Sequence, residues 1–508
     1  MAKGSMPVLV GVGQAVSHWD GASGLEGMPT ALGLAEEAAL KALADTQADD
    51  RTALIEAIDR VAMVRTMEDS IPGLTPPFGR CNNLPRGLSN AIGATPESVV
   101  YSDVGGQSPQ SLVNELAALI HAGDSECALL AGTENIGAQK AAGKQGLKPD
   151  LTVEIEGDME DRGFGPRMLT RAEAKHGLVK PAYFYGLFEN AIAHREGRTL
   201  AEHRVAMGAL FAKFSEVAAA NPYAQFKTAR SADFLATPSR ENYAFADPFL
   251  KWHIAQDAVN QAAAVLIMSE EKADMLGIPA AARIYLHGAG EAGDLHISER
   301  PKMDGSWAME IALTRALEQA GKTADDIELL DLYSCFPCAV FSSAGVLGID
   351  WETDPRALTQ TGGLPFFGGP GNNYSLHGIA STVEALRSKP DAHGLVLANG
   401  GWMTKEAAGV YSAKRPDQFM PAEAAAKADQ PVVLIEAPVA GKIETYTVVN
   451  GRNGPTHAII FGRDRRDRRF IASTAQSESL ARMTGETAII GEAVSISTEA
   501  EVNTFRFA

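Results

Sequence analysis

The stretch from residue 101 to residue 142, YSDVGGQSPQSLVNELAALIHAGDSECALLAGTENIGAQKAA, decides the fold. It begins with a Gly-rich turn at Gly105-Gly106 and continues into an amphipathic helix predicted over residues 109–121. An apolar strand is predicted over residues 127–134, and the stretch ends in Lys-Ala-Ala. A turn, a helix and a strand in this order form one unit of an α/β sheet.

The same order returns in residues 365–408, PFFGGPGNNYSLHGIASTVEALRSKPDAHGLVLANGGWMTKEAA. Here a Gly-rich turn precedes a helix predicted over residues 374–387 and a strand predicted over residues 394–401. This stretch ends in Lys-Glu-Ala-Ala. Because an internal repeat outweighs any single motif as evidence for a fold, the chain is predicted to contain two similar halves.

Around these two units, short runs of Val, Leu and Ile alternate with amphipathic stretches. This alternation predicts a parallel sheet with helices on both faces. The segments that carry it are 7–14, 30–45, 61–65, 98–104 and 128–132 in the first half and 282–287, 306–320 and 327–333 in the second.

Two regions depart from this pattern. Residues 136–245 have helical pieces without sheet alternation and are predicted to form an inserted loop domain. Residues 430–508 alternate as short strands, with a hairpin turn predicted at Asn450-Gly451, and are predicted to form a small all-β barrel. The halves are therefore expected at residues 1–280, which include the insertion, and at residues 281–425.

The bulk composition is that of a globular, multidomain protein, with 508 residues, 45% of them hydrophobic and 21% charged. A formal net charge of −18 argues against nucleic acid or an anionic membrane as partner, because an acidic surface repels polyanions. The four cysteines are too few for a disulfide framework and lack the spacing of a structural zinc site, and no other metal constellation is found. Without a signal peptide or an apolar run of about 18 residues, a cytoplasmic location is expected.

Four short motifs resemble those of the thiolase superfamily, in particular its type 1 thiolase-like proteins with an additional C-terminal β domain. The family's Cys-x-Ser motif corresponds to Gly106-Gln107-Ser108, and its Gly-His-Pro loop to Gly368-Gly369-Pro370. Its Cys-x-Gly-Gly motif corresponds to Ala398-Asn399-Gly400-Gly401, and its Asn-Glu-Ala-Phe motif to Tyr333-Ser334-Cys335-Phe336. The resemblance implies a duplicated five-layer α/β thiolase fold with an inserted loop domain, followed by a small C-terminal barrel of the oligonucleotide/oligosaccharide-binding (OB) type.

Each catalytic side chain that the resemblance would supply is missing from this chain. Gly106 replaces the nucleophilic cysteine, Gly369 the histidine and Ala398 the second cysteine. Loss of a covalent nucleophile together with its base costs on the order of 10⁶ in rate, so authentic thiolase activity is not expected. A glycine at position 106 still offers a backbone N–H to a thioester oxygen.

The resemblance places the substrate-binding residues at Gly106, Gln107, Ser108, Gly369, Asn399 and Gly400. Two residues are candidates for acid and base roles. The Tyr333 phenol can donate to a thioester oxygen, although its ordinary pKa near 10 requires help from the environment. His377, one turn into the predicted helix, either leans back toward the site or is a half-buried helix histidine. Ser108, at a helix start, is predicted to be a cap rather than a nucleophile.

Three further signals are weaker. Gly11-Val12-Gly13 is similar to a dinucleotide fingerprint, but Val16 stands at the third glycine position. Cys335 and Cys338 are predicted to pack in the core rather than to form a redox pair. The Arg-rich tract at residues 463–469 either binds phosphates or forms a solvated turn, and its interleaved aspartates favour the turn.

The sequence thus predicts an acyl-CoA-binding, thiolase-like protein, related to acetyl-CoA acetyltransferases, without the Cys-His-Cys machinery. CoA or acyl-CoA is the expected ligand, no other cofactor is expected, and a monomer and a homodimer both remain open. Three functional hypotheses follow: non-covalent carbon–carbon chemistry such as retro-aldol cleavage, a non-enzymatic CoA-binding or partner-docking role, and thiolysis through a rescuing residue such as Cys335.

Overall fold

The first of two central sheets lies in the N-terminal part of the chain. A computed structural model of the protein describes residues 4–485 and 488–508. In spatial order this sheet contains β1 (Pro7–Val16), β8 (Gln261–Ser269), β4 (Cys127–Glu134), β2 (Arg60–Met63), β3 (Ser98–Tyr101) and the short β5 (Glu160–Asp161).

The second sheet repeats the strand order of the first. It contains β10 (Leu329–Asp331), β11 (His393–Gly400), β12 (Lys405–Ser412), β9 (Tyr285–Gly293) and the short β13 (Ala426–Lys427). In the first sheet β8 lies between β1 and β4 and is antiparallel to both; in the second, β12 lies between β9 and β11 in the same way. The shared order supports the internal repeat read from the sequence.

The prediction of a parallel sheet is wrong, because both sheets are mixed. Strands β4, β2, β3 and β5 in the first sheet run parallel, as do β10 with β11 and β9 with β13 in the second. Strands β8 and β12 run antiparallel to both of their neighbours. In the second half a turn of four residues, 401–404, connects β11 to β12, and a hairpin connection of that length forces antiparallel pairing.

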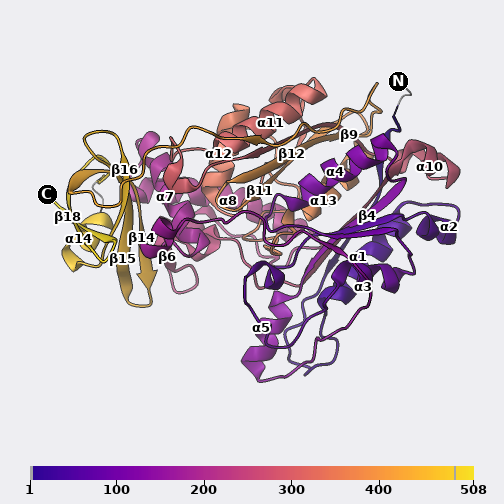
Figure 1. The fold of residues 1–508 in the computed structure, drawn as a ribbon, viewed down its shortest axis with the longest axis horizontal. Helices are drawn as coiled ribbons and strands as arrows, with labels where there is room; N and C mark the ends of the chain where they lie inside the picture. Colours follow the sequence, from indigo (N-terminus) through magenta and orange to yellow (C-terminus); the bar gives the residue numbers. More distant parts are fainter. Residues whose placement is uncertain (1–3, 486–487) are drawn as a thin grey trace.

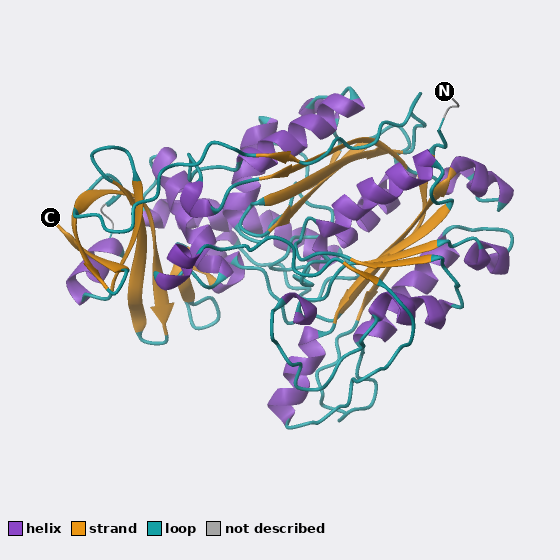
Figure 2. Ribbon diagram, viewed as in Figure 1, coloured by secondary structure: helices purple, strands orange, loops and turns teal. Residues whose placement is uncertain are grey.

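Helices form layers around and between the sheets (Figures 1 and 2). Helices α4 (Ser108–Ala122) and α13 (Tyr374–Ser388) contact both sheets and each other, so they lie between them. Helices α1 (Ala31–Asp45) and α3 (Leu84–Ile92) cover the outer face of the first sheet, and α11 (Trp307–Ala320) that of the second. Shorter helices complete the two halves: α2 (Arg51–Glu56), α10 (Glu270–Met275) and α12 (Pro337–Leu347).

Glycines in the first strand of each half allow a helix to approach closely. A Cβ atom on Gly11 or Gly13 of β1 would collide with the backbone carbonyls of Ala42 or Ala38 in α1. These glycines lie inside β1 rather than after it, so they do not form a dinucleotide-binding turn. Their role is the packing of a strand against a helix.

The inserted segment between β4 and β8 is mainly helical. It contains α5 (Ile136–Gln145), α6 (Arg171–Lys175), α7 (Pro181–Arg195), α8 (Leu200–Ala220) and α9 (Ala232–Ala236), and ends in β6 (Ala244–Asp247) and β7 (Phe249–Leu250). Aromatic side chains of α7 and α8 share one buried apolar cluster with α12 and the second sheet. The insertion therefore packs on the second half of the fold.

The C-terminal segment forms a β-rich domain. Its strands are β14 (Ala440–Gly451), β15 (Gly454–Arg463), β16 (Arg469–Thr474), β17 (Ala493–Glu499) and β18 (Val502–Phe507), with α14 (Ser477–Met483) between β16 and β17. The spatial order β15-β16-β18-β17-β14 closes on itself through the pairing of β14 with β15. The predicted turn at Asn450-Gly451 is wrong by two residues, because the ladder continues to the pair Gly451 and Gly454.

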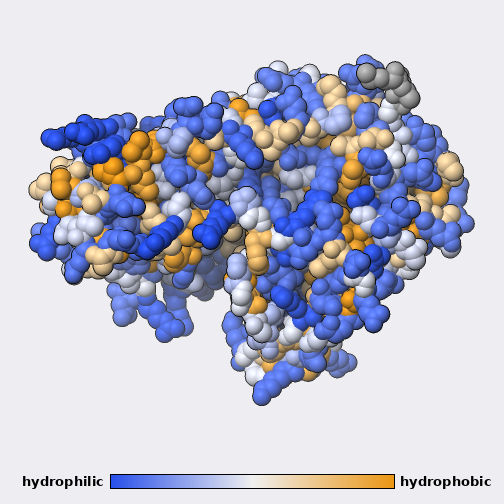
Figure 3. Space-filling view, in the orientation of Figure 1, coloured by the Kyte–Doolittle hydropathy of each residue, from blue (hydrophilic) through white to orange (hydrophobic). Residues whose placement is uncertain are grey.

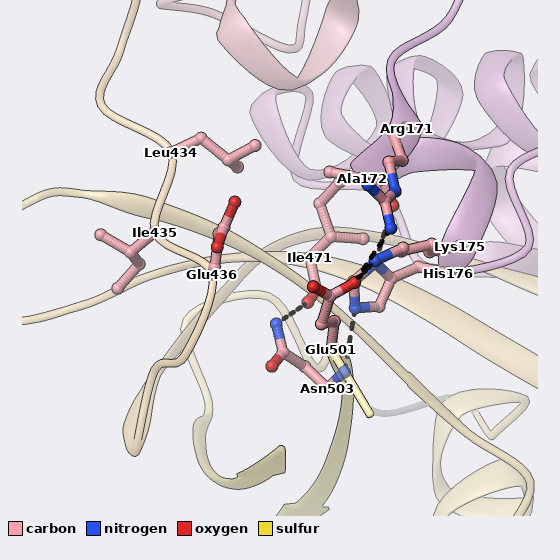
Figure 4. Close-up of a pocket in the computed structure, with 10 residues that line it drawn as sticks. All are labelled: Arg171, Ala172, Lys175, His176, Leu434, Ile435, Glu436, Ile471, Glu501 and Asn503. Carbon is pink, nitrogen blue, oxygen red and sulfur yellow. Dashed lines mark hydrogen bonds and ion pairs between the residues drawn. The ribbon is translucent and has the colours of Figure 1, made fainter. Parts of the chain in front are cut away.

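Two kinds of contact attach this domain to the rest of the molecule. The insertion's β6 pairs with β14, which extends the domain's sheet. Near α6, Glu501 forms ion pairs with Arg171 and Lys175, and His176 Nε2 accepts a 3.0 Å hydrogen bond from the backbone N–H of Asn503 (Figure 4). A small pocket of about 120 Å³ remains between them.

The surface drawn in Figure 3 is mostly hydrophilic, with apolar patches toward the C-terminal end. Within the described ranges, none of the helices combines the length and the apolar character needed to cross a bilayer.

Candidate functional site

Gly106 lies at the start of α4, between the two sheets. A Cβ atom at this position would collide with the hydroxyl of Tyr333 and the backbone carbonyl of Asn399. Within the described residues, the backbone N–H of Gly106 has no hydrogen-bond acceptor. The space that a side chain at position 106 would need is thus filled by a phenol, and a backbone donor of the helix start is left free.

Tyr333 follows β10 and is almost completely buried, with 5% of its surface exposed. Its ring packs edge-on against Tyr374 at 5.3 Å between ring centroids. Burial raises the pKa of Tyr333 well above its ordinary value of 10, so the phenol keeps its proton at neutral pH. Among the residues that the structure describes, no hydrogen bond of its hydroxyl is found, which leaves a second donor beside Gly106.

Gln107 closes the other side of Gly106. Its amide oxygen occupies the space where side chains on Gly105 and Gly400 would lie, so a side chain at either position would displace the Gln107 amide. That oxygen has no partner among the described residues, and Nε2 donates weakly to Ser108 Oγ at 3.4 Å. The Ser108 hydroxyl donates to the carbonyl of Asp103 at 3.2 Å instead of accepting from a helix amide, so the predicted capping role is not seen.

Asn399 ends β11 and connects the site to the insertion. Its Nδ2 donates to the Tyr185 hydroxyl at 3.1 Å, and the Tyr185 hydroxyl donates to the carbonyl of Gly401 at 3.1 Å. Tyr185 belongs to α7 and stacks on Phe336 at 4.3 Å. No sequence pattern pointed to Tyr185, because its position depends on how the insertion packs.

Gly369 and His377 lie apart from these donors. The N–H of Gly369 donates to the carbonyl of Gln256 at 2.8 Å, so this amide is already occupied. His377 Nδ1 pairs with Gln14 Oε1 at 2.8 Å, and burial lowers the pKa of His377 to about 3, which keeps the ring neutral. Ser375, rather than His377, is the residue of α13 that contacts Gly106, with Oγ donating to its carbonyl at 3.2 Å.

The cysteines of the Tyr-Ser-Cys-Phe region are buried thiols. Burial raises the pKa of Cys335 to about 12, so it is not a thiolate at neutral pH. Cys338 is completely buried in the same apolar cluster and its thiol faces the carbonyl of Tyr185. Neither has the electropositive surroundings of a reactive cysteine.

Glu406 is a residue of this region that sequence reasoning missed. It stands opposite Asn399 in the β11–β12 ladder, is 1% exposed and has no partner for either carboxyl oxygen among the described residues. The sequence offers one indication: Glu406 is a charged residue between Lys405 and the apolar run 407–411.

A groove runs along the chain just before Gly106. Val104 forms part of its wall, together with residues 164–171 of the insertion, and its volume is about 410 Å³. Arg167 and Arg171 line it. The groove therefore offers apolar walls and positive charge next to the free donors.

The comparisons with known proteins agree on the family. Over the whole length of both chains, the protein matches the crystal structure of a monomeric SCP2-thiolase like protein type 1 from Mycobacterium smegmatis, with 35% identity and a TM-score of 0.83. The chain belongs to the type 1 thiolase-like proteins. The model of the thiolase-like protein type 1 additional C-terminal domain matches residues 422–501.

More distant relatives of this thiolase-like protein extend the comparison. An acetyl-CoA acetyltransferase from Syntrophomonas wolfei is 30% identical over 143 residues, which are 28% of this chain and 34% of that relative. The match thus spans about a third of the curated relative. A structure titled Ltp2-ChsH2(DUF35) aldolase shares the fold over 82% of the chain, with 18% identity and a TM-score of 0.59.

Proposed function

We propose that this thiolase-like protein binds acyl-CoA thioesters non-covalently at Gly106 and Tyr333. The observation that carries the proposal is the pair of free donors, the N–H of Gly106 and the phenol of Tyr333, at a helix start. A thioester oxygen is the acceptor that such donors hold in acyl-transfer enzymes. The arginine-lined groove beside Val104 provides room and charge for the phosphates of CoA.

Calorimetric titration with CoA and acetyl-CoA tests this proposal. Acetyl-CoA is expected to bind more tightly than CoA in the unmodified protein, by the worth of one or two hydrogen bonds, about 3- to 30-fold. Tyr333→Phe should reduce this difference, whereas Arg167→Gln should weaken both ligands together. Absence of binding by either ligand would refute the proposal.

A second candidate function is carbon–carbon cleavage of a β-hydroxyacyl-CoA without a covalent intermediate. In this retro-aldol step the hydroxyl proton leaves to a base, the C2–C3 electron pair enters the thioester as an enolate, and a proton returns to C2. The neutral phenol of Tyr333 favours it, because it can stabilise the enolate oxygen as a donor. His377 is the candidate base, and its Nδ1 is hydrogen-bonded to Gln14 Oε1 at 2.8 Å.

Turnover separates the two candidates. If the protein is an enzyme, Tyr333→Phe should lower kcat by about 10²–10³, the typical loss for one donor to a developing oxyanion. Binding of thioesters without turnover would support the alternative of a non-enzymatic CoA-binding or partner-docking protein. Thiolysis that iodoacetamide blocks would instead point to a cysteine.

We also propose an assignment of the layers, the C-terminal barrel and the oligomeric state. We interpret the layers as the duplicated five-layer thiolase fold and the closed C-terminal strands as an OB-type barrel, whose strand order they match. We propose domain boundaries near residues 280 and 430, and a monomeric or homodimeric state in the cytoplasm. Light scattering of the purified protein decides the oligomeric state.

A further inference from the structure

The buried carboxyl group of Glu406 belongs to the same region as the proposed thioester site. Opposing residues of an antiparallel pair place their side chains on one face, so Glu406 and Asn399 point to the same side of the second sheet. Asn399 is also the residue whose backbone carbonyl borders Gly106. The side chain of Glu406 is therefore a neighbour of Asn399, which itself borders the proposed site.

Several polar atoms around Glu406 have no hydrogen-bond partner in the part of the chain that the structure describes. They are both carboxyl oxygens of Glu406, Oδ1 of Asn399 and Nη1 of Arg300. Arg300 is 2% exposed, and its Nη2 donates to the backbone carbonyls of Trp402 and Met403 in the turn between β11 and β12. Buried polar groups are rarely left without partners, so this set indicates a polar occupant that completes it.

The protonation state of Glu406 follows from its surroundings. A carboxylate at 1% exposure would cost free energy, because no hydrogen bond or ion pair from the described residues compensates the loss of water. Burial is the largest cause that raises the pKa of Glu406 well above its ordinary value, with Arg300 opposing and Asp294 adding to the shift. A neutral carboxylic acid both donates and accepts hydrogen bonds.

A plain alkyl chain bound beside Glu406 would leave all of these groups unpaired, and each unpaired buried group costs free energy. An acyl group that carries a hydroxyl or carbonyl oxygen would pair with them. We propose that Glu406 is a specificity residue, which together with Asn399 and Arg300 selects CoA thioesters whose acyl group bears a hydrogen-bonding oxygen. This inference rests on the proposed function, because it presumes that thioesters bind at Gly106.

The test compares butyryl-CoA with 3-hydroxybutyryl-CoA, which differ by one oxygen, by calorimetric titration of the full chain. The hydroxyacyl thioester is expected to bind about 10-fold more tightly, the worth of one or two satisfied hydrogen bonds. Glu406→Met, which keeps the size of the side chain but not its polarity, should bring the ratio of the two dissociation constants close to one. Glu406→Gln, which keeps a donor and an acceptor, should preserve most of the ratio.

A matched control is Glu216→Met on the exposed face of α8, which should leave the ratio as in the unmodified protein. Equal binding of the two thioesters to the unmodified protein overturns the inference but not the proposed function. A ratio that survives Glu406→Met assigns the selectivity to other residues and also overturns it. Failure of both thioesters and of CoA itself to bind refutes the proposed function instead. Thermal unfolding of each variant verifies that it is folded.

Discussion

At the scale of single residues, the glycine at position 106 is matched by the tyrosine beside it. Gly106 and Tyr333 are far apart in the sequence, yet the Tyr333 hydroxyl occupies the space of any side chain at position 106. The two residues therefore have to be considered as a pair. Restoring a cysteine at position 106 alone does not restore a thiolase site, because the cysteine has no space.

Gly106→Ala tests this pairing through stability. The added methyl group meets the phenol and a backbone carbonyl, so the variant should lose about 1–3 kcal/mol of unfolding free energy, as overpacked sites do. Urea denaturation measures the loss. Gly143→Ala in α5 is the control, since a Cβ there meets nothing and alanine favours a helix by about 0.5–1 kcal/mol. Equal effects at the two positions would contradict the pairing.

Glu406 gives the second prediction at this scale, a dependence of stability on pH. Its pKa is raised in the folded protein, so the native state binds more protons than the unfolded state, and stability falls as pH rises above the ordinary carboxyl value of 4.5. The loss amounts to about 1.4 kcal/mol per pH unit until the folded pKa is reached. Arg300, Asp294, Tyr333 and Cys335 are titratable groups that couple to it.

Glu406→Met removes the contribution of this carboxyl group to the pH dependence of stability. The variant should gain stability relative to the unmodified protein, and the gain should grow between about pH 5 and pH 7. Denaturation curves at several pH values measure the difference, in which the other buried carboxyl groups, such as Glu134, cancel. Parallel pH profiles for the two proteins would show that Glu406 is ionised in the folded state.

At the scale of elements, the two halves repeat a packing device as well as a strand order. Gly288 and Gly290 in β9 face the backbone carbonyls of Ala316 and Ala312 in α11, as the glycines of β1 face α1. In each half, a strand with a Gly-x-Gly pattern thus packs against a helix that has alanines four residues apart. The Gly-x-Gly pattern is visible in the sequence, where its first copy, Gly11-Val12-Gly13, is also similar to a dinucleotide fingerprint.

Gly288→Ala should destabilise the second half by about 1–3 kcal/mol, because the methyl group meets a backbone atom that cannot rotate away. Chemical denaturation measures the change. Gly345→Ala in α12, where a Cβ meets no atom, serves as the control and should be neutral or stabilising. An unchanged midpoint for Gly288→Ala would mean that the strand and helix separate without cost.

At the scale of the whole molecule, the C-terminal domain is attached through buried charges. Arg469 of β16 is completely buried, pairs with Glu444 of β14 and donates to the backbone carbonyls of Ser298 and Arg300. The Arg300 side chain in turn binds the turn between β11 and β12 that adjoins the site. Arg469 thus connects the C-terminal domain to residues 298–300. Arg300 in turn connects these residues to the turn beside the site.

Arg469→Met breaks this connection and leaves the half-buried Glu444 with Arg463 as its ion-pair partner. Loss of one partner of a buried ion pair typically costs about 3–5 kcal/mol, so the unfolding transition should shift strongly or split in two. Arg465→Met, at an exposed position of the same tract, should have almost no effect. Limited proteolysis between residues 415 and 440 reports whether the domain has detached.

The sequence by itself determined the repeat, the β-rich C-terminal segment and the absence of a side chain at position 106, because these follow from local patterns and from residue identity. Only the tertiary structure decided that the sheets are mixed, since strand direction depends on where the chain re-enters the sheet. It also decided which polar groups meet: Tyr185 and Glu406 reach the site, while His377 pairs with Gln14. Such contacts depend on the packing of segments distant in the chain, and no local pattern records them.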